Sequence, residues 1–188
     1  MKFKRELLRQ LIHSSGILFI FVGTIIPLPF LIILSLLAAI SGEIILKLDK
    51  KYYIPFLSKI LRNCRRDENE KGFIYFFLGL TLTFAFFGFN MAIANAAIII
   101  LVLGDASSTL VGKRLGKNKL PYHSHKTWQG SISFCLVGFL GAWTQLPLEI
   151  AFLGAASGAI IEAYTPLDDN ITIPVLSGTV MAFFIYFL

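Results

Sequence analysis

The sequence has little charge and almost no cysteine. Charged side chains make up 15% of the 188 residues, whereas soluble domains average about 25%. Cys64 and Cys135 define neither a disulfide framework nor a metal-binding spacing, and we expect two free thiols. A cleavable signal peptide is not predicted either, because no small-residue cleavage motif ends the first apolar run. These features exclude a disulfide-stapled secreted scaffold and leave little polar surface for a soluble fold.

Apolar residues are abundant instead. They make up 56% of the chain, and the mean hydropathy is +0.74, whereas soluble domains contain about 45–50% apolar residues. A helix crosses the roughly 30 Å apolar core of a bilayer with about 20 apolar residues. Candidate segments are residues 11–28, 29–46, 72–89, 91–103, 130–146, 148–163 and 171–188. The sequence therefore predicts an all-α, polytopic integral membrane protein of about seven transmembrane helices. We expect residues 1–188 to form a single membrane-embedded catalytic domain.

The connections between these segments alternate between very short and long. Pro27 and Pro29 separate the first two segments, Asn90 the third from the fourth, and Pro147 the fifth from the sixth. Such short connections predict tight helical hairpins. We also expect the fourth segment to continue as a helix through polar residues to Leu115.

The basic residues predict the orientation of the chain. All 17 Lys and Arg residues lie at the N-terminus, in the loop Lys47–Lys71 or in the loop Lys113–Lys126. With seven spans these regions share one side, which the positive-inside rule makes cytoplasmic. We therefore expect a cytoplasmic N-terminus and an external C-terminus. The formal charge of +6 fits basic loops beside anionic lipid better than nucleic-acid binding, because the loops are separated by membrane segments.

The strongest polar motif begins where the fourth apolar segment ends. Asp105 follows that segment directly, and a carboxylate at this depth is costly unless it is paired or binds metal. Glycines, which allow close approach of the backbone to a ligand, and basic residues follow it. These residues are Gly112, Gly116, Lys113, Arg114, Lys117, Lys119 and Lys126. A carboxylate, glycines and cations together predict a site for Mg²⁺-bound polyphosphate. The alternative is a basic loop that contacts lipid headgroups.

A second acidic cluster precedes the last apolar segment. Asp168, Asp169 and Asn170 are adjacent in the sequence, and Asn170 or Asp169 is a good N-cap for the following helix. Capping accounts for one of these side chains but not for the carboxylate pair. The cluster lies on the same predicted side as Asp105, which allows a shared metal site.

Further polar residues lie near the same boundary. Arg9, Gln10 and His13 stand at the cytoplasmic end of the first segment, and Glu43 and Glu162 lie within about one turn of that face. A carboxylate inside a membrane segment is a candidate for function by default. The simpler interpretation is that each glutamate pairs with a neighbouring basic residue.

The stretch 104–131 resembles a signature shared by CTP-using membrane lipid enzymes. Its Gly-Asp start, Gly-x-x-x-Gly-Lys centre and Lys-Thr-Trp-x-Gly-Ser end are similar to phosphatidate cytidylyltransferases and to the polyprenol kinase family, which covers dolichol kinases, phytol kinases and CTP-dependent diacylglycerol kinases. Two features favour the kinases. The segment 168–174 resembles their Asp-Asp-Asn-x-Thr-x-Pro motif, and Arg9-x-x-x-His13 resembles their Arg-Lys-x-x-His opening, with Gln10 in place of the usual lysine.

The resemblance implies a kinase that uses CTP with Mg²⁺ to phosphorylate a long-chain isoprenoid alcohol of the phytol, geranylgeraniol or dolichol type. Its active site would lie at the cytoplasmic membrane face. The implied metal ligands are Asp105, Asp168 and Asp169. The implied nucleotide-binding residues are Gly112, Lys113, Arg114, Gly116, Lys117 and Lys126. Additional candidates for the site are Glu43, Glu162 and Asn170. The general base is left open among Asp168, Asp105 and His13.

Two other functions fit parts of the pattern. A phosphatidate-type cytidylyltransferase would use the same nucleotide and metal to make a CDP-lipid, but the Asp-Asp-Asn segment argues for the kinase. A small lipid transporter is more remote, because transporters place polar groups near the bilayer midplane on broken helices. Here the ionisable residues follow one face, and only the uncharged Asn95 lies deeper.

Overall fold

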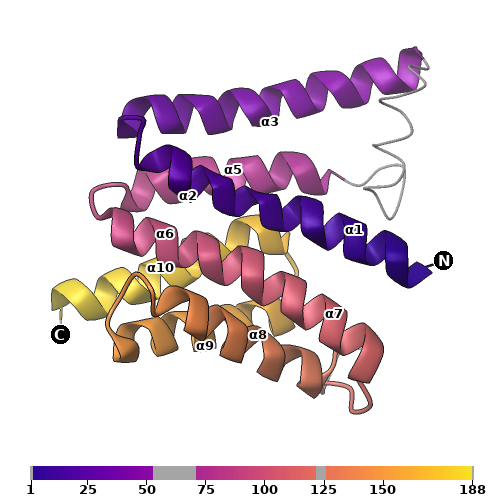
Figure 1. Ribbon diagram of the computed structural model, residues 1–188, viewed down its shortest axis with the longest axis vertical. Helices are drawn as coiled ribbons and strands as arrows, with labels where there is room; N and C mark the ends of the chain where they lie inside the picture. The colour runs from indigo at the N-terminus through magenta and orange to yellow at the C-terminus, as the bar shows by residue number, and fades with distance from the viewer. Residues whose placement is uncertain (1, 53–70, 122–125, 188) are drawn as a thin grey trace.

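The computed structural model describes residues 2–52, 71–121 and 126–187, and these residues are almost entirely helical (Figure 1). Within these ranges, extended backbone pairs at a single bridge between Lys119 and Thr127. The all-α prediction is therefore confirmed for the described part of the chain.

The helices follow the apolar segments in order. They are α1 (Lys2–Ser14), η1 (Ser15–Ile17), α2 (Leu18–Gly23), α3 (Leu28–Lys51), α5 (Gly72–Phe87), α6 (Met91–Ile99), η2 (Ile100–Gly104), α7 (Asp105–Leu115), α8 (Trp128–Ala142), α9 (Leu148–Tyr164) and α10 (Asp169–Phe187). The short stretch η1 is 3₁₀-helical and η2 is π-helical. Because α1, η1 and α2 are contiguous, as are α6, η2 and α7, the described residues form seven helical rods. The predicted continuation of the fourth segment to Leu115 is confirmed.

The short connections are tight turns, as predicted. Pro27 directly precedes α3, and Pro147 directly precedes α9. Proline before or in the first turn of a helix removes an N–H that would have no partner there. Asn90 caps α6 because its side-chain oxygen accepts a hydrogen bond of 3.2 Å from the Ala92 backbone N–H. Each pair of flanking helices therefore forms a hairpin.

The α6–η2–α7 rod lies at the centre of the bundle (Figure 1). In its most apolar window 61% of residues are buried, against 22% for α3 and 33% for α10. Ala94, Ala96 and Ala97 of α6 are fully buried, and their small side chains let neighbouring helices pack closely around this rod.

The outside of the bundle is apolar. Ile25 is 82% exposed and Phe89 is 67% exposed, and many other large apolar side chains also face outward. Three helical stretches, Leu28–Asp49, Met91–Leu115 and Asp169–Phe187, are long and apolar enough to cross a membrane, while α5 and α8 are shorter apolar helices. An exterior with this many exposed large apolar side chains is typical of a surface that contacts lipid.

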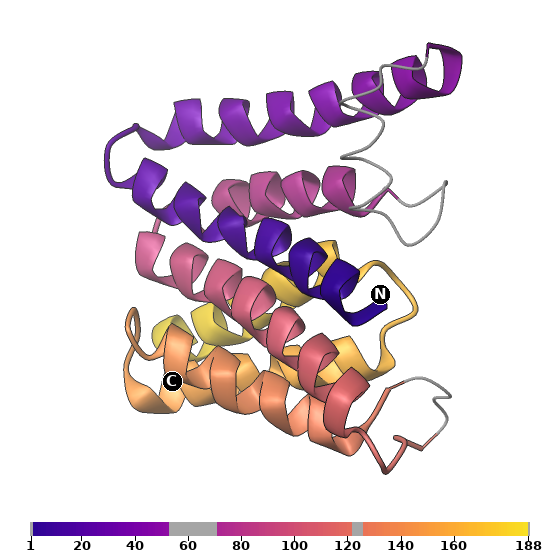
Figure 2. The same ribbon diagram turned by 45° about the vertical axis from the view of Figure 1, so that its right-hand side comes forward.

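Polar helix ends gather on one side of the molecule. The first turns of α1, α5, α8 and α10 and the last turns of α3, α7 and α9 lie at the right in Figure 1, and Figure 2 shows the same grouping from a second angle. The C-terminus lies at the opposite end. The described basic residues therefore share one end of the bundle. Cys135 in α8 is a free thiol, whereas Cys64 and most of the basic loop Lys47–Lys71 lie outside the described residues.

Candidate active site

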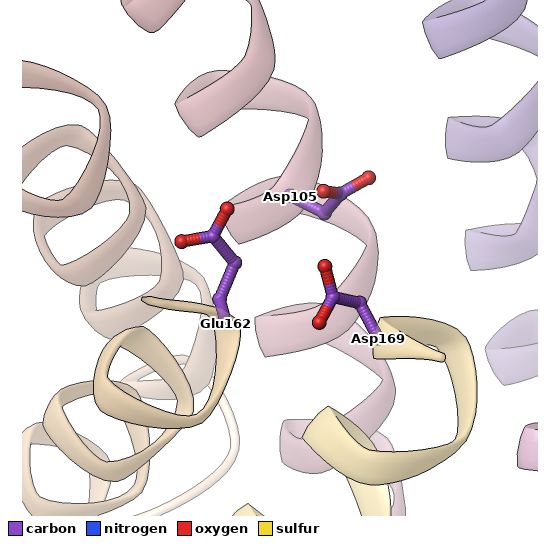
Figure 3. A group of neighbouring side chains, drawn as sticks. All are labelled: Asp105, Glu162 and Asp169. Carbon is purple, nitrogen blue, oxygen red and sulfur yellow. The ribbon is translucent and has the colours of Figure 1, made fainter. Parts of the chain in front are cut away.

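Three carboxylates from three helices meet at this polar end. They belong to Asp105 at the start of α7, Glu162 in the last turn of α9 and Asp169 at the start of α10 (Figure 3). One oxygen of each lies within 4.8 Å of the others, and Glu162 is only 6% exposed. We call these residues the carboxylate triad. Like charges held this close are unfavourable unless a cation offsets them.

The π-helical stretch η2 determines where Asp105 points. It ends at Gly104, directly before Asp105, and a π-helical turn changes the direction of every side chain that follows it in the helix. A methyl group on Gly104 would lie 2.8 Å from Cζ of Phe134 in α8. The missing side chain therefore lets the Phe134 ring pack against the turn that presents Asp105 to the triad.

The start of α10 separates the two adjacent aspartates. Asp168 is the N-cap, because its Oδ1 accepts hydrogen bonds of 3.0 Å from the Asn170 backbone N–H and 2.9 Å from the Asn170 side chain. The prediction that Asp169 or Asn170 caps this helix is therefore wrong. Since the helix begins at Asp169, that carboxylate points into the triad, while Asp168 lines the cavity beside it.

Close packing of α5 holds this first turn of α10 in place. A methyl group on Gly79 of α5 would collide with the backbone carbonyl of Asn170. Only a glycine lets α5 come this near to the turn that carries Asp169. The position of Asp169 therefore depends on a residue far from the polar motifs in the sequence.

Lys126 is a cation that contacts two of the three carboxylates of the triad. Its Nζ lies 3.2 Å from Glu162 Oε1 and 3.2 Å from Asp169 Oδ2, and it also donates to the Glu162 backbone carbonyl. Burial disfavours the charged ammonium, but the carboxylates of Glu162 and Asp169 outweigh burial and raise the pKa of Lys126 above its usual value. Lys126 therefore stays charged at neutral pH, and its positive charge offsets part of the negative charge of the triad.

A cavity of about 900 Å³ opens beside the triad. Besides the triad, its lining includes four cationic side chains and several small or hydroxyl-bearing residues. The cations are Arg9, Lys71, Lys113 and Lys126, and the small or hydroxyl-bearing residues are Gly72, Ser108, Thr109, Gly112, Thr127, Gly130 and Ser131. Ser108 donates a hydrogen bond of 3.1 Å to Glu162 Oε1 and so orients that carboxylate. The cavity thus combines oxygen ligands for a metal with cations and close backbone suited to phosphate.

The N-terminal helix α1 contacts the central rod beside this cavity. His13 Nε2 has no hydrogen-bond partner and lies 3.9 Å from Asp105 Oδ2. Glu6, which the sequence analysis missed, forms an ion pair of 2.5 Å with Lys113 of α7. The missed signal was a stripe of polar residues, since Glu6, Arg9, Gln10 and His13 recur at helical spacing on one face of α1.

The other residues predicted for the site are divided between the cavity and positions outside its lining. Gly116 ends α7, where a side chain would collide with Thr127. Arg114 and Lys117 are exposed and are not part of the cavity lining. Glu43 belongs neither to the triad nor to the cavity lining, and it pairs with Lys47 at 3.4 Å and with the cavity-lining Lys71 at 3.7 Å. Of the additional candidates, Glu162 joins the triad, and Asn170 lines the cavity beside the N-cap of α10.

Curated proteins from plants and an archaeon resemble this chain. A probable chloroplastic phytol kinase of Oryza sativa subsp. japonica is 28% identical over 93% of the chain and 65% of its own length. An uncharacterized protein of Methanocaldococcus jannaschii is 30% identical over 90% of the chain and 89% of its own length. A chloroplastic farnesol kinase of Arabidopsis thaliana is 29% identical over 65% of the chain and 45% of its own length.

The chain is shorter than the plant relatives, since the matches span from 45% to 65% of these two kinases. No family model matches the chain, and no solved structure matches it. The matches to the phytol and farnesol kinases extend over most of the sequence. These similarities relate the chain to the polyprenol and phytol kinase family.

Proposed function

We propose that this protein transfers the terminal phosphoryl group of CTP to the hydroxyl of a long-chain isoprenoid alcohol. The observation that carries the proposal is the meeting of the carboxylate triad with the cations of one cavity at the polar end of an apolar bundle. A polyphosphate needs the cations and a metal, while a lipid alcohol needs access from an apolar surface. The related phytol and farnesol kinases support a prenyl alcohol as acceptor. CTP as donor is proposed from the resemblance of residues 104–131 to CTP-using lipid enzymes.

The triad fits Mg²⁺ by its chemistry. Asp105, Glu162 and Asp169 offer hard oxygen ligands, which Mg²⁺ prefers, and their like charges call for a cation. Bound there, Mg²⁺ would neutralise charge on the phosphate oxygens. Asp168 is engaged in capping α10, so we place it beside the metal ligands rather than among them.

The chain's own cations would hold the nucleotide. Lys113 and Lys126 line the cavity from α7 and from the segment before α8, and lysine binds phosphate as a compact charge. Gly112 and Gly130 face each other across these two elements, since a methyl group on Gly130 would lie 3.5 Å from Cα of Gly112. Phosphoryl transfer depends mainly on positioning and charge stabilisation, and these groups supply both.

We assign the hydroxyl proton to His13. Its Nε2 lies without a hydrogen-bond partner 3.9 Å from the Asp105 carboxylate, at the edge of the triad. A base in this place would accept the proton as the alcohol oxygen attacks. Replacement of His13 by Gln should lower kcat more than it raises the KM for either substrate; a kcat equal to that of the wild type would refute the assignment.

The deciding experiment uses purified protein in detergent with Mg²⁺, geranylgeraniol and CTP labelled on the γ-phosphate. Transfer of label to the lipid phase is the expected result, and a panel of alcohols then defines the acceptor. If the lipid stays unlabelled, α-labelled CTP with a lipid phosphate tests the cytidylyltransferase alternative. Label that enters the lipid only from the α-position would overturn the kinase proposal.

We further propose that the chain crosses the membrane several times with the polar end in the cytoplasm, since the basic helix ends share that side. Single cysteines at Lys117 and at Thr144, in a Cys64→Ser, Cys135→Ser background, report the orientation. Both positions are exposed; Lys117 follows the end of α7, and Thr144 lies in the turn between α8 and α9. These two connections lie at opposite ends of the bundle (Figure 1). An impermeant maleimide added to intact cells should label the Thr144 position alone; labelling at Lys117 alone would reverse the orientation.

A further inference from the structure

Glu6 is a buried carboxylate that lies between two cations of the cavity. It is 7% exposed. Its Oε1 accepts hydrogen bonds from the Arg9 guanidinium, at 2.5 Å from Nη2 and 3.1 Å from Nε. Its Oε2 accepts one of 2.5 Å from the Lys113 ammonium. The two carboxylate oxygens of Glu6 therefore accept hydrogen bonds from two different cations.

The two cations come from different helices and line the same cavity. Arg9 lies on α1 and Lys113 on α7, and both belong to the cavity lining, whereas Glu6 does not. Without a negative charge between them, two cations on one wall would repel each other. Gln10 adds a hydrogen bond of 3.3 Å to Glu6 Oε1, which further restricts the carboxylate.

We propose that Glu6 is a positioning residue, which holds Arg9 and Lys113 where they bind the phosphates of the nucleotide. The inference rests on the proposed kinase function and extends it to a residue outside the polar motifs. Lys113 donates one of its three ammonium N–H groups to Glu6, so this ion pair fixes the direction of the other two. Glu6 acts through these two cations and touches no substrate itself.

The loss of the Glu6 carboxylate has two opposite effects on nucleotide affinity, one through charge and one through the position of the two cations. Replacement of Glu6 by Gln adds one unit of positive charge beside the cavity, and on electrostatic grounds alone a polyphosphate would bind more tightly. Loss of position has the other sign, because the amide accepts through one oxygen only and turns a donor toward a cation. The direction of the change in nucleotide affinity therefore separates the two effects.

The test compares the wild type with Glu6→Gln in the γ-labelled CTP assay and by direct binding of a fluorescent CTP analogue. We expect the KM and Kd for the nucleotide to rise about tenfold, as for the loss of a hydrogen bond to a charged group. The kcat and the KM for the alcohol should stay within roughly threefold, since the lipid does not meet these cations. A nucleotide KM that is unchanged or lowered overturns the proposal.

Three further variants locate the effect. Glu6→Asp keeps the charge and should recover part of the affinity, which a merely structural role would not require. In a Lys113→Met background, Glu6→Gln should raise the Kd for the nucleotide by a smaller factor than in the wild type, because one of the two cations that Glu6 holds is already gone. Glu149→Gln changes an exposed carboxylate in the first turn of α9, at the other end of this helix from Glu162, and should leave nucleotide affinity unchanged.

The two proposals fail in different ways. A wild type that binds the analogue but labels no lipid contradicts the kinase function, and the binding data still decide the role of Glu6. A wild type that labels lipid, with Glu6→Gln matching it in nucleotide KM, contradicts the role of Glu6 alone. Full additivity of Glu6→Gln and Lys113→Met likewise contradicts it.

Discussion

The Lys126 ammonium lies 3.2 Å from a carboxylate oxygen of Glu162. The two residues come from the segment before α8 and from the last turn of α9, and their contact joins the basic end of the central motif to a buried carboxylate. The same ammonium lies 3.2 Å from Asp169. Lys126 is therefore in a position to contact the metal ligands and a phosphate in the cavity.

Replacement of Lys126 by Ala should raise the KM for CTP by about tenfold or more, since a charge-assisted contact to phosphate is lost. The KM for the lipid alcohol should change less, because the acceptor carries no charge that Lys126 would meet. Steady-state kinetics with each substrate varied in turn provide the measurement. An unchanged apparent affinity for CTP would remove Lys126 from the nucleotide site.

Replacement of Asp105 by Asn should abolish activity, with a loss of at least about 100-fold in kcat/KM, as for the loss of one preorganised electrostatic contact in an active site. The amide is nearly the same size as the carboxylate, so the protein should remain in the membrane fraction with unchanged helix content. Labelled-lipid formation together with circular dichroism tests both parts. Full activity of this variant would contradict a metal at the triad.

Replacement of Glu162 by Gln should weaken Mn²⁺ binding by about tenfold or more, as changes in and around metal ligands commonly do. Mn²⁺ serves as a spectroscopic substitute for Mg²⁺, and electron paramagnetic resonance measures the free ion in detergent without any turnover. Glu149→Gln is the matched control, because Glu149 is exposed and lies in the first turn of α9, at the other end of this helix from Glu162. Equal losses in both variants would contradict the assignment of Glu162.

Replacement of Gly79 by Ala should destabilise the protein by about 1–3 kcal/mol, as overpacking of a core does. The new methyl group would collide with the Asn170 carbonyl, and activity should fall because Asp169 moves with that turn. Gly138→Ala is the control, since the nearest atom to its methyl group would lie at an ordinary 3.7 Å. Thermal unfolding in detergent should separate the two variants, and equal melting temperatures would contradict the close approach of α5 to α10.

Much of the architecture could be predicted from local properties of the sequence. Apolar runs long enough for helices predicted the rods, and prolines and Asn90 predicted the tight turns between them. The grouping of basic residues predicted which helix ends share a side, because two rods, an even number, separate each basic region from the next. Asp105 was identifiable because a carboxylate directly after an apolar run needs a specific reason to be there.

Which carboxylates form the triad could not be predicted from the sequence in this way. Asp168 and Asp169 are neighbours, and successive side chains in a helix point about 100° apart, so only the residue at which α10 begins decides which carboxylate enters the site. The sequence favoured the wrong N-cap, and the fold makes Asp168 the cap and leaves Asp169 to the triad. The inclusion of Glu162 in the triad, and not of Glu43, also depends on tertiary structure, because the packing of α9 on the central rod brings Glu162 to the site.

The sequence by itself therefore determined the helical rods, their shared polar end and the chemical types that gather there, because hydrophobicity and charge act on each segment independently of its partners. Only the tertiary structure decided which side chains meet. Glu6 of α1 reaches Lys113 of α7, and Lys126, just before α8, reaches Glu162 of α9. These contacts join segments that are distant in the chain, and they depend on how the helices pack and rotate against one another. That rotation is set by close packing at sites such as Gly79 and Gly104.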